Sequence, residues 1–162
     1  MEYKRYIPSP LGQILLTGNS MGITGVQFVD DQDCPNYIHT PEAVKAIFSQ
    51  AEKWMRAYFA GEKPAELPSL QLHCTPFQRE VYKILLSIPY GTTVTYGQIA
   101  KMIAVSKGKR MSAQAVGGAV GKNPISLMIP CHRVIGSNGS LTGYSGGLHR
   151  KKKLLELENS GR

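Results

Sequence analysis

The chain has 162 residues, of which 42% are apolar and 19% charged, enough for one compact domain or two small ones. No run of about 18 apolar residues is present, and the first residues lack the apolar core of a signal peptide, so we expect a cytoplasmic protein without a membrane span. Three widely spaced cysteines exclude a disulfide framework and leave room for a reactive thiol.

The net charge of +8 is unevenly distributed along the chain. Residues 1–74 carry 6 Lys or Arg and 8 Asp or Glu, a net charge of −2, whereas residues 75–162 carry 13 and 3, a net charge of +10. A basic half indicates a polyanion partner such as nucleic acid. A solvated surface that aids solubility is the alternative interpretation.

The first part of the chain predicts three strands and a helix. Apolar or β-branched runs at 3–7, 13–17 and 23–29 are separated by turn-forming residues. From Val44 to Phe59 apolar residues recur at three- and four-residue steps, which predicts a helix with Gly61 just past its end. The Pro-containing stretch 63–68 is typical of a linker.

The second part predicts a helix-turn-helix. Thr75 and Thr95 each precede a helix start with Gln three residues later, which is a capping box, and Ser112 begins a third helix. That third helix is nearly all small residues, and interior glycines such as Gly117 and Gly118 each cost about 1 kcal/mol relative to Ala. The reason is either close packing on a neighbouring helix or close approach by a large partner such as DNA.

A candidate nucleophile follows the apolar run 125–129. Cys131 precedes His132 and Arg133, and positive neighbours favour the thiolate. If the segment is extended, adjacent side chains point to opposite faces. A contact between Cys131 and His132 then requires irregular backbone or a bridging water. A buried cysteine acting as a small apolar residue is the alternative interpretation.

The remaining residues predict a long loop and a last helix. Residues 136–147 are too rich in Gly and Ser for a core element, and long loops in compact domains are often functional. A helix that starts near Gly147 places Glu158 on the same side as Leu154 and Leu155. Glu158 then either reaches water or orients a histidine, which would complete a Cys-His-Glu arrangement.

Three spaced segments carry a resemblance to a known family: residues 121–125, residues 130–133, and Gly143-Tyr144-Ser145-Gly146-Gly147-Leu148. Together they resemble the O6-alkylguanine-DNA alkyltransferases. The resemblance is specific from about Thr75 to Glu158 and looser before that. It implies an N-terminal α/β domain with a ribonuclease-H-like sheet at residues 1–68. A mainly α C-terminal domain of helix-turn-helix or winged-helix type would span 69–162.

The resemblance also implies an activity: irreversible, single-turnover transfer of an alkyl group from O6-alkylguanine, and from O4-alkylthymine, in double-stranded DNA to Cys131. Five residues match catalytic positions of that family: Cys131, His132, Glu158, Tyr96 and Asn123. Residues that match its DNA-binding positions are Ala113, Gln114, Ala115, Gly117, Gly118, Arg133 and Ser137. The alkyl pocket matches Tyr144, Ser145 and Val134.

Two departures from the family pattern stand out. Gln114 replaces an arginine that fills the gap left by the flipped base, and Gln lacks the charge and stacking plane of Arg. The connection from Ile103 to Met111 is longer than is usual in that family and is basic, which predicts extra phosphate contacts.

We expect no cofactor and no metal, because Cys34, His39, His73 and Cys74 lack the spacing of a metal site. A monomer is expected.

Three other functions are open on the sequence. A non-catalytic protein that binds alkylated DNA would share the fold, but relatives of that kind lack the acceptor cysteine. A transcriptional regulator would need a sensor or dimerisation segment. A cysteine hydrolase would leave the basic charge and the Gly-Gly helix without a role.

Overall fold

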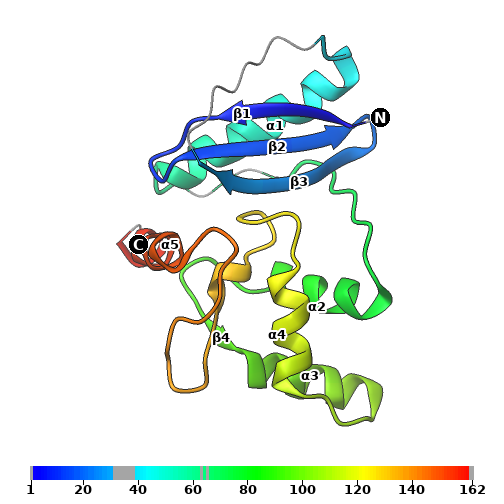
Figure 1. The fold of residues 1–162 in the computed structure, drawn as a ribbon, viewed down its shortest axis with the longest axis vertical. Coiled ribbons are helices and arrows are strands. Elements are labelled where there is room, and N and C mark those ends of the chain that lie inside the picture. Colours follow the sequence, from blue (N-terminus) through cyan, green and yellow to red (C-terminus); the bar gives the residue numbers. More distant parts are fainter. Residues whose placement is uncertain (1, 31–38, 63, 65, 161–162) are drawn as a thin grey trace. The chain divides into compact units, whose positions relative to one another are not determined.

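The computed structural model describes residues 2–30, 39–62, 64 and 66–160. The chain forms two compact units that divide between His73 and Cys74 (Figure 1). Over the described residues, no helix is both long enough and apolar enough to cross a membrane.

The N-terminal unit is a three-stranded antiparallel sheet with one helix packed on it. The strands β1 (Tyr3–Ile7), β2 (Gln13–Asn19) and β3 (Gly22–Val29) pair in the order β1-β2-β3. Helix α1 (Glu42–Phe59) lies along the sheet and buries one apolar face that includes Val44, Phe48 and Met55. The three strands and the helix predicted for this part of the chain are thereby confirmed.

The stretch after the predicted linker pairs with β3. The Ile23 amide donates to the Ser69 carbonyl at 2.7 Å, and the Gln71 amide donates to the Ile23 carbonyl at 2.7 Å. Gly22 allows this approach, because it has a φ of +152° and a Cβ there would clash with the Ser69 carbonyl. These bonds attach residues 69–73 to the N-terminal unit.

The C-terminal unit is mainly helical. Its elements are α2 (Pro76–Leu86), β4 (Val94–Thr95), α3 (Tyr96–Lys107), α4 (Ala113–Gly121), the single 3-10 turn η1 (Cys131–Arg133), β5 (Val134–Ile135) and α5 (Leu148–Ser160). Thr75 and Thr95 both form complete capping boxes, and the Ser112 hydroxyl accepts from the Ala115 amide at 3.0 Å. All three predicted helix starts are confirmed.

Helices α2, α3 and α4 pack as the predicted helix-turn-helix. The buried residues Val81, Ile99 and Val116 come from the three helices in turn. The buried Tyr82 hydroxyl donates to the Ala119 carbonyl at 3.0 Å, so α2 also holds α4 through a hydrogen bond. This packing leaves one face of α4 exposed, with Gln114 and Gly118 on it.

A short parallel pair joins the helices to the segment that contains Cys131. Val94 pairs with Val134 and Thr95 pairs with Ile135. The first residue of α3, Tyr96, is therefore brought to the segment just after β5. The same pairing holds η1, directly before β5, against the helical core.

Candidate active site

The backbone before Cys131 is folded into turns. Leu127 has a left-handed φ of +74°, and residues 125–130 are all buried. The Asn123 side chain donates to the Ile129 carbonyl at 2.8 Å and accepts from the Ile125 amide at 3.0 Å. Asn123 therefore closes the turns, and the extended geometry considered from the sequence does not occur here.

Cys131, His132 and Arg133 share one 3-10 turn. On an extended strand the Cys131 and His132 side chains would point to opposite faces. The 3-10 turn is an irregular backbone, of the kind expected if both residues serve one site. Cys131 is 4% exposed, and His132 is completely buried. The sequence pattern favoured an apolar strand at this point and contained no signal for the turn.

A buried carboxylate orients His132. The Glu158 Oε2 atom lies 2.6 Å from His132 Nε2, and α5 supplies this carboxylate from 26 residues later in the chain. Arg133 donates to the same carboxylate from Nε at 2.8 Å and Nη2 at 3.1 Å, and the Gly91 amide donates to Oε1 at 3.0 Å. Glu158 is thus held as a carboxylate, so Nε2 of His132 carries the proton that it accepts.

The sequence-based assignment of Arg133 to the DNA surface is corrected by these contacts. Its guanidinium is buried, bonds Glu158 twice, and donates from Nη1 to the Ile88 carbonyl at 2.7 Å. A buried guanidinium needs such partners, because removing its charge from water costs free energy that an opposite charge and hydrogen bonds must offset. Arg133 therefore fixes Glu158 from inside the unit.

Burial sets the ionisation of the two reactive side chains. It raises the pKa of the Cys131 thiol, while hydrogen bonds from Asn123 and Ser126 and the charge of Lys151 act in the opposite direction. Burial also lowers the pKa of His132, against the effect of Glu158. Near neutral pH the site therefore pairs a protonated thiol with a neutral imidazole that can accept a proton.

Lys151 is a site residue that the sequence interpretation missed. Its side chain is completely buried on α5, and Nζ donates to the Val134 carbonyl at 2.6 Å and the Thr142 carbonyl at 2.7 Å. Burial lowers its pKa, while Cys131 acts in the opposite direction. The signal in the sequence is helical spacing, because Lys151 lies three residues before Leu154 and seven before Glu158, on the buried face of α5.

The loop 136–147 covers the site as the predicted functional loop. The Tyr144 ring packs edge-on against the His132 ring, with 6.4 Å between centroids, and burial raises the pKa of Tyr144 well above its usual value. The Ser145 and Ser126 hydroxyls lie 3.4 Å apart. Val134 is buried directly after η1. The three residues matched to the alkyl pocket thus surround the reactive turn.

Tyr96, α4 and this loop meet at a surface pocket of about 460 Å³. It is lined by Tyr96, Gly97, Ala113, Gln114, Gly117, Ser137, Thr142 and Gly143. The Tyr96 hydroxyl donates to the Thr142 carbonyl at 3.4 Å, the same carbonyl that accepts from Lys151. Four matched DNA-binding residues and the matched catalytic tyrosine therefore lie around one opening.

The adjacent glycines Gly117 and Gly118 of α4 are not explained by packing within the protein. A Cβ at Gly117 would lie 3.8 Å from the Tyr96 ring, an ordinary contact, and a Cβ at Gly118 would meet nothing within 4 Å. Ala115 is exposed as well. Close helix packing, one of the two explanations offered from the sequence, therefore does not account for Gly118.

Comparisons with known proteins match both units. Residues 76–160 match the model of the 6-O-methylguanine DNA methyltransferase DNA-binding domain, and residues 2–73 match the ribonuclease-like domain of the same proteins. The chain belongs to the 6-O-methylguanine DNA methyltransferase family. A relative from Mycobacterium tuberculosis, named methylated-DNA–protein-cysteine methyltransferase, is 45% identical over 99% of this chain and 94% of its own. One from Methanosarcina acetivorans with the same name is 43% identical over 98% and 99%.

Solved structures agree with this family membership. A crystal structure of Mycobacterium tuberculosis OGT in complex with DNA is 43% identical, covers 98% of this chain and 93% of its own, and has a TM-score of 0.81. An O6-methylguanine DNA methyltransferase from Methanococcus jannaschii is 32% identical, covers 96% and 93%, and has a TM-score of 0.70. The fold class and family expected from the sequence are both confirmed.

Within 2–30, 39–62, 64 and 66–160 there is no group of three or more His, Cys, Asp or Glu that could hold a metal ion. Cys34, considered as a ligand from the sequence, lies outside the described residues. Cys74 is a half-buried free thiol.

Proposed function

We propose that this chain repairs DNA by transferring an alkyl group from O6-alkylguanine in double-stranded DNA to Cys131. The observation that carries the proposal is a buried thiol on the same 3-10 turn as an imidazole whose Nε2 is held by Glu158. Membership of the methyltransferase family supports the same chemistry. The proposal includes O4-alkylthymine as a second substrate, a monomeric protein and a cytoplasmic location.

The geometry assigns a direction to the proton transfer. Because Nε2–H of His132 donates to Glu158, Nδ1 is the nitrogen that accepts the thiol proton, directly or through a water molecule. The Arg133–Glu158 pair then stabilises the imidazolium that forms. Lys151 and Asn123 favour the thiolate, and both act against the effect of burial on the Cys131 pKa.

The bond changes balance within this set of residues. The thiolate attacks the alkyl carbon, a carbon–sulfur bond forms, and the bond from that carbon to O6 breaks. The electron pair remains on guanine, and the Tyr96 hydroxyl supplies a proton to the leaving base. The proton that His132 accepted from the thiol then returns to the Tyr96 oxygen through solvent. General acid help of this kind is worth about 100- to 10,000-fold in rate.

Access to Cys131 requires the base to leave the duplex. The thiol is 4% exposed, so a stacked base cannot reach it. Extruding a base costs a few kcal/mol, and least for a damaged base. Gln114 lines the pocket beside Tyr96, and in this proposal its amide hydrogen-bonds the base left behind in the duplex. An arginine at this position would add charge and a stacking plane.

The product is a thioether at Cys131, which has no good leaving group. The protein is therefore consumed in one turnover, unlike enzymes that regenerate their nucleophile in a second step. The alternative of a non-catalytic protein that binds alkylated DNA has no observation in its favour, since the thiol and its His132–Glu158 pair are present.

The test is mass spectrometry of the protein after incubation with a duplex that contains O6-methylguanine. We expect one methyl group per molecule, located on the peptide with Cys131. Cys131→Ala should bind DNA without transfer, and Cys74→Ala, the matched control at the other described thiol, should transfer normally. More than one equivalent repaired, or a methyl group on another cysteine, would contradict the assignment.

A further inference from the structure

Helix α4 contains no charged side chain. Its residues Ala113–Gly121 read AQAVGGAVG, so Gln114 is its one polar side chain. Neutralisation of phosphates by Lys and Arg supplies essentially all of the sequence-independent affinity of proteins for DNA. The charge that holds DNA against α4 must therefore come from residues outside the helix.

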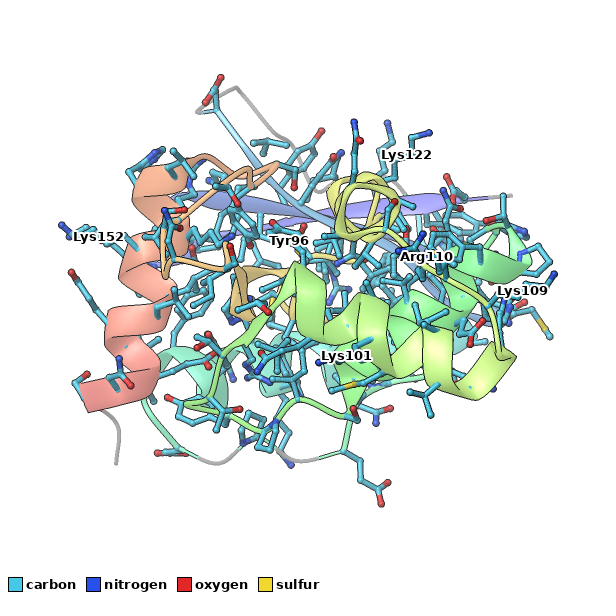
Figure 2. The ribbon with its side chains drawn as sticks, turned by 90° about the horizontal axis from the view of Figure 1, so that it is seen from below. Tyr96, Lys101, Lys109, Arg110, Lys122 and Lys152 are labelled. Carbon is cyan, nitrogen blue, oxygen red and sulfur yellow. The ribbon has the colours of Figure 1, made fainter. Side chains whose placement is uncertain are left out.

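Exposed cations stand at both ends of α4. Lys109 and Arg110 precede its N-cap, and Lys122 follows its last residue. Nine residues give the helix a length of roughly 14 Å, and the two groups flank a stretch of that length. Figure 2 shows Lys109 and Arg110 near the end of α3 and Lys122 beside α4, whereas Lys152 points away on α5.

No acidic side chain neutralises these three cations within the part of the chain that the structure describes. The sequence has no Asp or Glu between Glu80 and Glu156. Glu80 already pairs with Lys107 at 3.0 Å, and Glu158 is buried against His132 and Arg133. The positive charge at the ends of α4 is therefore available to an external anion.

The backbone before α4 is fixed rather than loose. Lys107 is anchored by Glu80 and lies 5.9 Å from the centre of the Phe77 ring. Gly108 then reverses the chain with a φ of +65°, and the amides of Gly108 and Lys109 both donate to the Ala104 carbonyl. This cap sets the position of the next two residues ahead of α4.

We propose that Lys109, Arg110 and Lys122 form an end clamp that binds backbone phosphates on both sides of the point where α4 meets DNA. The clamp rests on the proposed function and deepens it by naming the residues that supply the positive charge that α4 itself lacks. Arg110 can bind a phosphate with two parallel hydrogen bonds, while the two lysines act as point charges. Lys107 does not belong to the clamp, because its charge is used by Glu80.

The salt dependence of binding tests the end clamp. The full chain is titrated with a fluorescent, undamaged duplex of about 16 base pairs at several salt concentrations. Each lost phosphate contact lowers the slope of log K against log salt by about 0.9, so Lys109→Gln/Arg110→Gln should lower it by about 1.8 and Lys122→Gln by about 0.9. Between about 50 and 200 mM salt, the double variant should then lose roughly tenfold less affinity than the unmodified chain.

A matched control separates a local contact from net charge. Lys152→Gln removes the same charge from exposed α5 and should leave the slope unchanged. An unchanged slope in the double variant, or an equal change in Lys152→Gln, would overturn the clamp. Methyl transfer from the free O6-methylguanine base should be normal in every variant, and its loss in the clamp variants would also count against a separate phosphate site. Failure of that reaction in the unmodified chain would instead refute the proposed function.

Discussion

The C-terminal unit holds two sets of cations that differ in where their hydrogen bonds go. Arg133 and Lys151 are buried, and their donors are taken by Glu158 and by three backbone carbonyls. Lys109 and Arg110 are exposed and have no acidic partner among residues 66–160. A basic net charge therefore has two separate uses here: the first set shapes the reactive turn, and the second is available to DNA.

The largest effect should follow from Glu158→Gln. The change keeps the shape of the side chain and leaves the Arg133 guanidinium buried without its carboxylate. Breaking a buried pair from one side costs about 3–5 kcal/mol, so the free energy of unfolding in urea should fall by that order. Methyl transfer should also slow, because the amide can no longer hold the imidazolium.

Glu156→Gln is the matched control for that change. Glu156 is exposed on the same helix, and surface substitutions usually alter stability by less than about 0.5 kcal/mol. Equal destabilisation by the two variants would mean that the buried carboxylate has no special role.

The pH dependence of transfer should reveal the neutral imidazole. Burial lowers the pKa of His132 from 6.5 and raises that of Cys131 from 9.0. The single-turnover rate should therefore be level from pH 8 to 6.5 and fall only at more acid pH, as His132 becomes protonated. In His132→Gln the level region should disappear, and the rate should rise with pH towards the thiol pKa. The exposed His149, changed to Gln, should leave the profile unaltered.

Lys151→Met should have a smaller effect that is specific to the thiol. Loss of the ammonium removes a charge that favours the thiolate, so the Cys131 pKa should rise, as followed by thiolate absorbance. Each unit of increase corresponds to about tenfold in the thiolate population. Lys152→Met, at the exposed neighbouring position, should leave the thiol titration unchanged. A normal titration in Lys151→Met would limit Lys151 to a structural role.

The smallest effect should come from Gly118→Ala, with opposite signs for stability and binding. The added Cβ meets no atom within 4 Å, and Ala is favoured over Gly in a helix by about 1 kcal/mol, so thermal unfolding should shift upwards. Affinity for duplex DNA should fall, because the methyl group would stand between α4 and its partner. Unchanged affinity would place this face of α4 away from the DNA.

Local patterns predicted the fold well. The strands and helices follow from alternation and three- or four-residue spacing, and the caps at Thr75, Thr95 and Ser112 mark three of the helix starts. These features depend on neighbours within about four residues, which a single sequence contains. The position of Glu158 on the buried side of α5 was predictable for the same reason.

The parts of the site that could not be predicted depend on distant partners. The turns that precede Cys131 are closed by Asn123 and buried under other elements, and no periodicity reports them. Arg133 was assigned to DNA binding through the family resemblance, whereas its partners are Glu158 and the Ile88 carbonyl. The family resemblance supplied residue roles, but it did not supply the direction of this side chain.

The separation along the chain between the partners of the reactive site bears on the order of folding. Helices α2 to α4 and their caps need only residues 75–122, whereas Glu158 must return to the Gly91 amide, 67 positions earlier. Closing such loops delays long-range contacts relative to local ones. During synthesis, we therefore expect the DNA-binding helices to form first, and the chain to become reactive only after the ribosome has released α5.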